Sequence, residues 1–337
     1  MTKTLKDHFS IIRSREEVIT EIYNTADLLH VYEGWTEEQQ TLFLDYCTGM
    51  RGIKILYDQF FKLILSPEQY PERLESILSA ILNEPVKILQ VLPNESTRIA
   101  AEKSLLVLDI VVELNDRSIA NVEVQRIGYA FPGQRSACYS ADLLMRQYKR
   151  VKKSKRKNFR YSDIKKVYTI VFFEKSSSDF HKFPHTYIHR SKQQTDTGLQ
   201  IDLLQEYIFI SLDIFKNNLQ NKGISKDNEL EAWLTFLSVD DPKWILKLIE
   251  THPKFKKLYL EIYEACRNTE VFMGLFSKEL LELDQNTVDF MIDEMQDTID
   301  AQKVEIDSQA KQIAEQQLQL NEKDALIAQL QKQLAEK

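Results

Sequence analysis

The sequence is poor in the residues on which several common kinds of site depend. Its 3 cysteines lie far apart and form no CxxC pair, which argues against a disulfide framework or a cysteine zinc site and favours a reducing cytoplasm. Its 8 glycines form no glycine-rich phosphate loop, so a P-loop ATPase is not expected. No apolar run reaches the roughly 18 residues of a membrane span, and the first residues lack the apolar stretch of a secretory signal. We therefore expect a cytoplasmic protein without a membrane segment.

The net charge of −7 does not by itself predict a nucleic-acid partner, yet it hides a local concentration of cations. Between residues 146 and 157 there are 8 basic residues and no acidic one. This basic run consists of Arg146, Lys149, Arg150, Lys152, Lys153, Lys155, Arg156 and Lys157. Tyr148, Phe159 and Tyr161 are interleaved with it or follow it closely. Such density is typical of binding to DNA phosphates, and the alternative is a solvated basic surface with no ligand.

The order of the apolar patterns predicts an α/β fold with a central sheet and helices before and after it. We expect strands at 86–92, 105–114, 118–127, 167–173 and 207–212. We expect helices from Thr36 to about Gly49, at 53–65, at 71–82 and from Gln134 to about Arg150, and again between 228 and 297. The expected domains are an N-terminal helical region (1–83), a core (84–222), a C-terminal helical region (223–285) and a tail (286–337).

The tail carries an apolar residue at every seventh position. These residues are Ile292, Ile299, Ile306, Ile313, Leu320, Ile327 and Leu334. The second seam position is mostly polar: Met295, Gln302, Gln309, Gln316, Lys323 and Leu330. A coiled coil that joins two or more copies of the chain is the natural interpretation. A solvated single helix or a partly disordered tail is the alternative.

Two adjacent strand-like runs carry the strongest signal for a site. In the second run Asn121, Glu123 and Gln125 alternate with apolar residues, so they share one face. The first run contains Asp109. A three-residue turn at 115–117 would set Asp109 directly opposite Glu123, whereas a two-residue turn would send the two carboxylates to opposite faces.

Two carboxylates that meet on a sheet bind a hard divalent cation well, and Mg²⁺ prefers one or two carboxylates together with water and phosphate oxygens. The alternative is an ordinary hairpin with one solvated face. The almost continuous apolar stretch from Leu105 to Ile110 argues against it, because such a strand is buried on both faces and a buried aspartate needs a partner or a metal.

The helix that follows the hairpin offers two further candidates. Arg135 and Tyr139 are four residues apart and lie on one helical face. The arginine can neutralise charge that develops on a reacting phosphate, and the tyrosine can orient a phosphate or a water. Alternatively, Arg135 pairs with a carboxylate of the sheet and has a purely structural role.

Together these segments carry a family resemblance. It rests on residues 57–62 (YDQFFK), 109–114 (DIVVEL), 121–125 (NVEVQ), 131–135 (FPGQR) and 139–142 (YSAD). In this order they resemble the PD-(D/E)XK family transposases, the recombination-promoting or Rpn-like nucleases, over roughly residues 32–215. Asp109 followed by Glu123 and Gln125 is similar to the D…ExQ variant of the nuclease motif.

The resemblance implies a restriction-endonuclease-like mixed sheet flanked by helices, which cuts DNA with Mg²⁺ or Mn²⁺. It implies Asp109 and Glu123 as metal ligands, with the carbonyl of Val124 as a third. Gln125 occupies the position where such nucleases usually have lysine. An amide can orient water but supplies no charge. Lys149 or Arg135 is therefore a candidate for the missing cation. Asp58 is a candidate additional acid, and the alternative for it is an ion pair with Lys62 four residues on.

Two functions follow from these features. The first is a Mg²⁺-dependent DNA endonuclease, associated with transposition or recombination, whose basic run holds DNA and whose residues 286–337 join copies of the chain. The second is a catalytically weak or inactive DNA-binding or assembly protein that retains the nuclease fold. Gln125 in place of lysine is the feature that favours the second.

Overall fold

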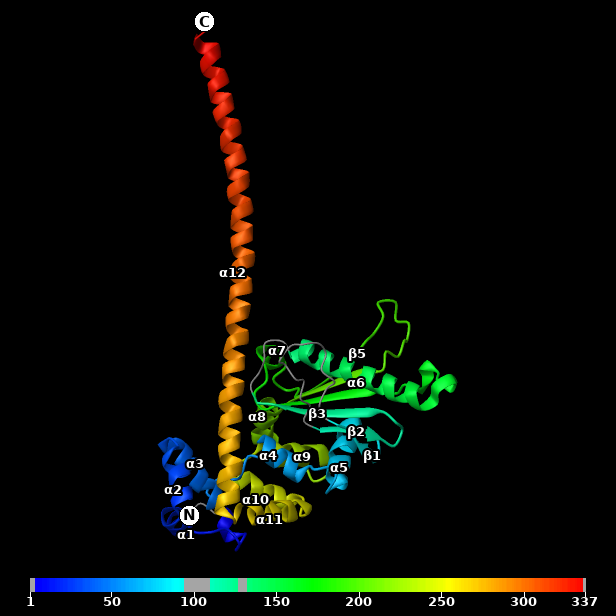
Figure 1. The fold of residues 1–337 in the computed structure, drawn as a ribbon, viewed down its shortest axis with the longest axis vertical. Coiled ribbons are helices and arrows are strands. Elements are labelled where there is room, and N and C mark those ends of the chain that lie inside the picture. Colours follow the sequence, from blue (N-terminus) through cyan, green and yellow to red (C-terminus); the bar gives the residue numbers. More distant parts are fainter. Residues whose placement is uncertain (1–3, 94–109, 127–131, 336–337) are drawn as a thin grey trace. The chain divides into compact units, whose positions relative to one another are not determined.

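A computed structural model describes residues 4–93, 110–126 and 132–335 of the chain. These residues divide into two units, the first ending at Asp284 and the second beginning at Gln285, and each is described here by itself. Figure 1 shows the elements, coloured along the sequence from blue at the N-terminus to red at the C-terminus. None of the described helices is long and apolar enough to cross a membrane.

The first unit is built around a six-stranded mixed sheet with the strand order β1-β2-β3-β4-β6-β5 (Figure 1). The strands are β1 Ile88–Val91, β2 Ile110–Leu114, β3 Ile119–Gln125, β4 Val167–Phe173, β5 Ile188–Lys192 and β6 Gln205–Ser211. β3, β4 and β6 are parallel to one another, and the other neighbours are antiparallel. The α/β fold and the mixed sheet agree with the sequence, except that β5 was not expected.

The helices are α1 Arg15–Asn24, α2 Ala26–Glu33, α3 Glu37–Cys47, α4 Asp58–Ile64, α5 Pro71–Leu82, α6 Pro132–Lys155, α7 Ser178–His181, α8 Leu212–Lys222, α9 Glu229–Ser238, α10 Pro242–Thr251, α11 Lys254–Cys266 and α12 Thr269–Ala335. Short 3-10 turns lie at Leu5–Asp7, Arg156–Asn158 and Tyr161–Asp163. The boundaries expected for α5 are confirmed, and α3 begins with the expected capping box, in which the Thr36 hydroxyl accepts a hydrogen bond from the Gln39 amide.

The helix expected at 53–65 begins only at Asp58, so that prediction was wrong over its first turn. Ile53, Ile55 and Leu56 are apolar at neighbouring positions, and all three are buried. A helix cannot bury residues 55 and 56 together with 53 on one narrow face, whereas an irregular segment can turn each of them into the core. The Gly52 amide also donates to the Asp240 carbonyl at 2.7 Å, which fixes this segment against the start of α10.

The turn between β2 and β3 has the length on which the site prediction depends. The Leu114 amide donates to the Ser118 carbonyl at 2.8 Å, and Ile110 pairs with Val122. Three residues, 115–117, therefore form the turn, and Arg117 takes the left-handed conformation (φ 73°) that closes such hairpins. The three-residue turn is confirmed. Asp109 lies outside the described residues.

The two faces of the sheet pack differently. On one face Val112, Val122 and Ile170 join the large apolar core, which the helices before and after the sheet complete. Phe61 of α4 meets Phe172 of β4 on this side, with ring centroids 6.5 Å apart.

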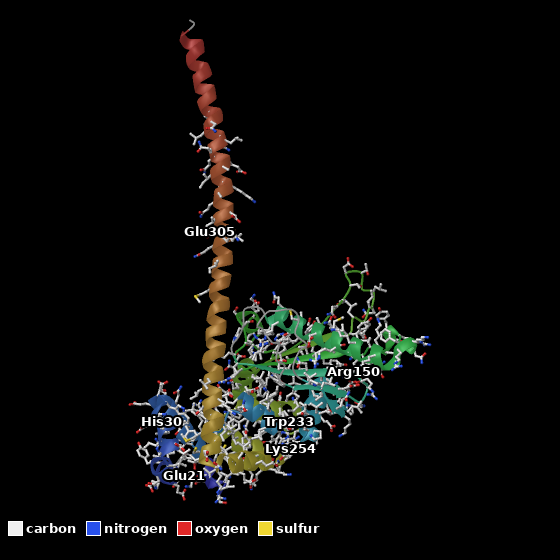
Figure 2. The ribbon with its side chains drawn as sticks, in the orientation of Figure 1. Glu21, His30, Arg150, Trp233, Lys254 and Glu305 are labelled. Atoms are coloured by element: carbon white, nitrogen blue, oxygen red, sulfur yellow. The ribbon has the colours of Figure 1, made fainter. Side chains whose placement is uncertain are left out.

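On the other face α6 covers the sheet. Tyr139 and Leu143 of this helix form a smaller apolar cluster with Val111, Ile119 and Val167, one residue from each of three neighbouring strands. Pro132 supplies the first residue of α6, where a missing amide hydrogen costs nothing. Figure 2 shows Arg150 further along the same helix, among its many polar side chains.

The second unit is the continuation of α12 from Gln285 to Ala335. Ile299, Ile306, Ile313 and Leu320, four members of the heptad series, are more than half exposed. The tail is therefore helical over its described length. The coiled coil stays a prediction, because an exposed apolar series invites a partner but does not identify one.

Candidate functional site

A row of polar side chains from β3 lies buried between the sheet and α6. Asn121, Glu123 and Gln125 are 0%, 3% and 4% exposed. They share the face of the sheet that carries Val111 and Ile119, which α6 covers. The interpretation of this hairpin as having a solvated face is therefore wrong. A buried carboxylate must be paired or bound to a cation, so this polar row is a candidate site.

Several atoms of this region find no hydrogen-bond partner within the described part of the chain. They are Oδ1 of Asn121, both amide atoms of Gln125 and, on β4 beside Asn121, the hydroxyl of Thr169. Asn121 Nδ2 donates to Glu123 Oε1 at 3.0 Å, which orients the carboxylate along the row. Each buried polar atom without a partner costs about 1–3 kcal/mol. A sequence selected for stability alone would place apolar residues here, so the row is better explained by a polar ligand or function.

The first turns of α6 bring the two expected helical residues together. The Arg135 guanidinium lies 5.3 Å from the centre of the Tyr139 ring. Arg135 is exposed, whereas Tyr139 is only 3% exposed and packs on the sheet beside Val111. The shared helical face is therefore confirmed. The tyrosine forms part of the cover over the polar face, and the arginine stays open to solvent.

One cation of the basic run has a structural partner that the sequence did not reveal. Arg150 Nη2 lies 2.9 Å from Oε2 of Glu113, a residue of β2 that is 3% exposed. Arg117 Nη1 is 3.3 Å from the other carboxylate oxygen, and Gln90 of β1 also donates to Glu113. Glu113 is thus a saturated buried acid, and Arg150 is partly committed to holding α6 on the sheet.

The remaining members of the run differ in their availability. Arg146 pairs with Asp142, and Lys155 pairs with Asp163. The cations without an acidic partner among the described residues are Lys149, Lys152, Lys153, Arg156 and Lys157, and all of them are exposed. Exposed cations of one sign at this density favour the binding of an anionic ligand.

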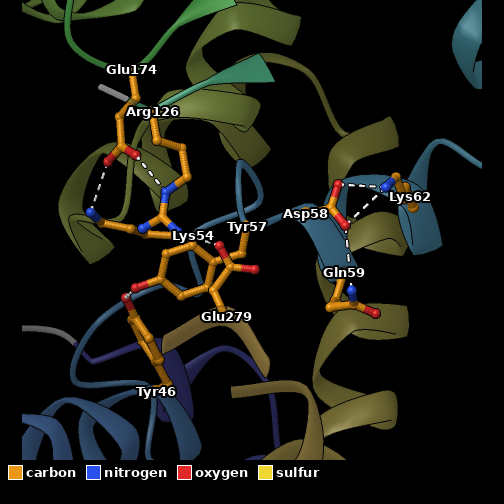
Figure 3. A network of polar contacts seen from close by, with 9 residues as sticks. All are labelled: Tyr46, Lys54, Tyr57, Asp58, Gln59, Lys62, Arg126, Glu174 and Glu279. Carbon is orange, nitrogen blue, oxygen red and sulfur yellow. Dashed lines mark hydrogen bonds and ion pairs between the residues drawn. The ribbon is translucent and has the colours of Figure 1, made fainter. Parts of the chain in front are cut away.

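Asp58 lies at the start of α4 and pairs with Lys62, whose Nζ is 2.8 Å from Oδ1 of the aspartate (Figure 3). The Gln59 amide donates to the same carboxylate at 3.3 Å. This is the pairing at i+4 that was the alternative for Asp58. Lys62 also lines a cavity of about 590 Å³ together with Ile110 and Val111, so the pair lies beside the beginning of β2.

Figure 3 shows a second polar cluster, which sequence reasoning missed. Its Arg126 follows Gln125 directly, so alternation turns the two side chains to opposite sides of β3. Glu174, directly after β4, lies 2.9 Å from Lys54 Nζ and 3.2 Å from Nε of Arg126, directly after β3. Arg126 also pairs with Glu279 of α12 and stacks on the Tyr57 ring, with its guanidinium 4.6 Å from the ring centre. We call these five residues the charge network.

Burial alone would raise the pKa of the Glu174 carboxyl, but the charges of Lys54 and Arg126 outweigh it and hold the pKa below its ordinary value of 4.5. Glu174 is thus held ionised within the charge network. Its members come from four separate segments of the chain, and no local motif joins them. A strand end followed by a charged residue, as at Arg126 and Glu174, is the single signal that could have pointed to it.

The family model for the PD-(D/E)XK nuclease family transposase matches residues 55–289, which is most of the chain. The chain belongs to this family. The match begins and ends later than the range of 32–215 that the motifs suggested, and so takes in α8 to α11 and the first part of α12. No curated protein and no solved structure matches the chain.

Membership indicates a nuclease or transposase-associated function and a hydrolase that acts on nucleic acid. The six-stranded mixed sheet flanked by helices is consistent with this family. Nucleases of this kind generally use divalent metal ions. The described residues contain no group of three histidine, cysteine or acidic side chains that could hold a metal. They do supply the buried Glu123 carboxylate and the unpartnered amide oxygens of Asn121 and Gln125, which is the hard-oxygen chemistry that Mg²⁺ accepts.

Proposed function

We propose that the protein is a metal-dependent DNA endonuclease that hydrolyses phosphodiester bonds with Mg²⁺ or Mn²⁺ and acts in transposition or recombination. The observation that carries the proposal is the buried polar row on β3. The buried Glu123 carboxylate accepts a hydrogen bond from Asn121 Nδ2 there, and it lies among amide atoms that lack partners in the described chain.

The metal would be held by Asp109, Glu123 and the Val124 carbonyl. The pairs Val112–Ala120, Val111–Asn121 and Ile110–Val122 follow one register. If that register continued by one position, 109 would pair with 123. This arithmetic supports the two-carboxylate ligand set. A bound divalent ion would polarise the scissile phosphate and lower the pKa of the attacking water.

Three neighbouring side chains would complete the reaction centre. Gln125 lies two residues beyond Glu123 on the same face, so its amide would orient the attacking water. Arg135 would offset charge on the phosphate, and Tyr139 would fix its position. Arg135 is a better source of the missing cation than Lys149, which lies ten residues beyond Tyr139 on α6, or about 15 Å along the helix axis. Asp58 would be a further acidic group near the site.

DNA would lie across the exposed cations of the basic run, which follow the site along α6 and the turn after it. Residues 286–337 would pair with a second copy of the chain, because the tail exposes apolar residues at heptad spacing. Two paired chains could then present two sites to the two DNA strands. The test of the tail is sedimentation of a chain truncated after Asp297: we expect a smaller assembly, and an unchanged assembly contradicts the pairing.

A catalytically weak DNA-binding or assembly protein with the same fold is the second candidate. Gln125 favours it, because an amide in place of the usual lysine removes a positive charge from the site. The basic run and the tail would keep their roles in this case.

Incubation of supercoiled plasmid with Mg²⁺ or Mn²⁺ separates the two. We expect the parent protein to nick the plasmid and the Asp109→Ala and Glu123→Ala variants to leave it intact while still retarding it in a gel. Lys6→Ala, an exposed substitution at the other end of the chain, serves as the matched control and should nick like the parent. Retardation without nicking by any of these proteins would favour the second candidate.

A further inference from the structure

A large pocket lies at the end of the sheet opposite the carboxyl ends of the parallel strands. It has a volume of about 950 Å³ and opens between the second half of α6 and the segment that leads into β4. Leu144, Met145, Ile164 and Leu204 supply apolar walls, and Lys165 lies at the rim. This volume is in the range of pockets that take a whole small molecule or nucleotide.

One wall of the pocket is aromatic. The rings of Tyr148 and Tyr161 are near parallel, with an angle of 13° and centroids 6.3 Å apart. Phe159 packs edge-on against both, at 5.5 Å and 5.4 Å, and so holds the pair in place. Tyr161 is nevertheless 77% exposed, the largest exposed fraction among the large hydrophobic side chains in the described parts of the chain. A rigidly held but exposed ring presents a flat surface for stacking.

Lysines lie beside this wall, and Asp116 and Asp202 line the pocket together with Lys165 and Lys166. Lys152 Nζ donates to the Tyr148 hydroxyl at 2.7 Å and lies 5.1 Å from the centre of that ring. Lys149 and Lys153 are on the same part of α6 and are exposed. A ligand that matches both features has a flat ring and carries negative charge. A nucleotide has both, whereas an apolar segment of a protein would leave the cations unpaired.

We propose that this pocket binds one unpaired base of a nucleic-acid strand, stacked on Tyr161, with the flanking phosphates held by Lys152 and Lys165. The proposal rests on the nuclease function and narrows its substrate. Paired bases in a duplex interior do not offer a free face, so the pocket selects DNA with a single-stranded segment or a frayed end.

The position of the pocket also sets its distance from Glu123. The Ile119 amide, at the start of β3, donates to the Lys166 carbonyl, and Lys166 lines the pocket. Glu123 is four residues further along the same strand, or about 13 Å away. The unpaired base would therefore lie only a few nucleotides from the scissile phosphate, and cleavage would be placed at a fixed distance from the junction of single and double strands.

The test compares the binding of three fluorescent DNA probes to the full chain: a blunt duplex, the same duplex with a single-stranded extension, and the single strand. Tyr161→Ala should weaken binding of the extended and single-stranded probes at least about fivefold and leave the blunt duplex nearly unchanged. Tyr161→Phe keeps the ring and should bind like the parent. Tyr23→Ala, which removes a tyrosine that is 60% exposed on α1, is the matched control.

The pocket assignment would be overturned if Tyr161→Ala weakened the binding of all three probes equally or of none. A pocket that binds an apolar protein partner would leave the binding of all three probes unchanged. The pocket and the nuclease function fail separately. If the parent binds the extended probe through Tyr161 but does not cut plasmid, the pocket assignment is supported and the endonuclease function is contradicted. If the parent cuts plasmid and Tyr161→Ala binds the three probes with the same preference as the parent, the endonuclease function is supported and the pocket assignment is wrong.

Discussion

The two sides of strand β3 differ in whether their buried polar groups have partners. On one side the charge network around Arg126 pairs each charge with a partner from another segment. On the other side the polar row of Asn121, Glu123 and Gln125 keeps amide atoms without partners in the described chain. Gln125, the last residue of the strand, and Arg126, which follows it, thus serve chemistry on one side, by our proposal, and stability on the other. Burial of a polar side chain is therefore informative only together with the number of its hydrogen-bond and ion-pair partners.

The largest effect is expected at Arg126. Arg126→Met removes the guanidinium from between Glu174 and Glu279 and leaves the carboxylates buried without it, which should lower the free energy of unfolding by about 3–5 kcal/mol. Urea unfolding followed by circular dichroism measures it. Arg117→Met, which removes a largely exposed partner of Glu113, is the control and should cost less than about 1 kcal/mol. Similar losses for both variants would mean that the charge network is not a structural unit.

The next effect has the opposite sign and concerns the adjacent residue. Gln125→Leu replaces two unpartnered amide atoms by an apolar side chain of similar size, so we expect the free energy of unfolding to rise by about 1–3 kcal/mol. Nicking of plasmid should fall at the same time, since the attacking water loses its amide contact. A variant that is less stable than the parent would show that Gln125 has a structural partner, and the contrast between the two sides of β3 would be lost.

A smaller effect is expected along the basic run. Lys153 is exposed and has no acidic partner among the described residues, so Lys153→Ala should weaken DNA binding. The plot of log K for DNA binding against log salt concentration should become less steep, its negative slope shrinking in magnitude by about 0.9. Lys155 is paired with Asp163, and Lys155→Ala should change the slope less. Titrations of duplex DNA at several salt concentrations measure both. Equal slopes for the two variants would remove the distinction between free and paired cations.

The pH dependence of stability tests the ionised state of Glu174. Its pKa is lower in the folded protein than the ordinary value of 4.5, because Lys54 and Arg126 outweigh the effect of burial. The stabilisation is therefore complete above that value and is lost as the pH falls through the lowered folded-state pKa. Parent stability should thus decline with acid more steeply than that of Glu174→Gln. Parallel curves would show that the carboxyl is not held ionised by its partners.

Much of the fold follows from local signals. The apolar run at 167–173 predicts β4 with its bounds, and Pro71 marks the start of α5, which the structure ends at Asn83 in the left-handed conformation. The length of a polar turn, residues 115–117, fixes the register of β2 on β3, because a change of one residue would turn every side chain to the other face.

Other features depend on partners far away in the sequence. β5 was missed because an edge strand such as Ile188–Lys192 is exposed and polar, so it has no apolar alternation. The pairing of Arg150 with Glu113 and the charge network join segments that only the folded sheet brings together. Of the expected site, Glu123, Gln125, Arg135 and Tyr139 lie on the elements foreseen for them, and their roles stay predictions. Asp109 lies outside the described residues.

The central claim is that the polar row on β3 holds a divalent metal. Calorimetric titration of the full chain with Mn²⁺, beside Glu123→Gln, tests it most directly because the readout needs neither DNA nor catalysis. We expect the parent to bind the ion and the variant to lose that binding while its circular dichroism spectrum stays like that of the parent. Undiminished binding of Mn²⁺ by Glu123→Gln, or no binding by the parent, would contradict the account.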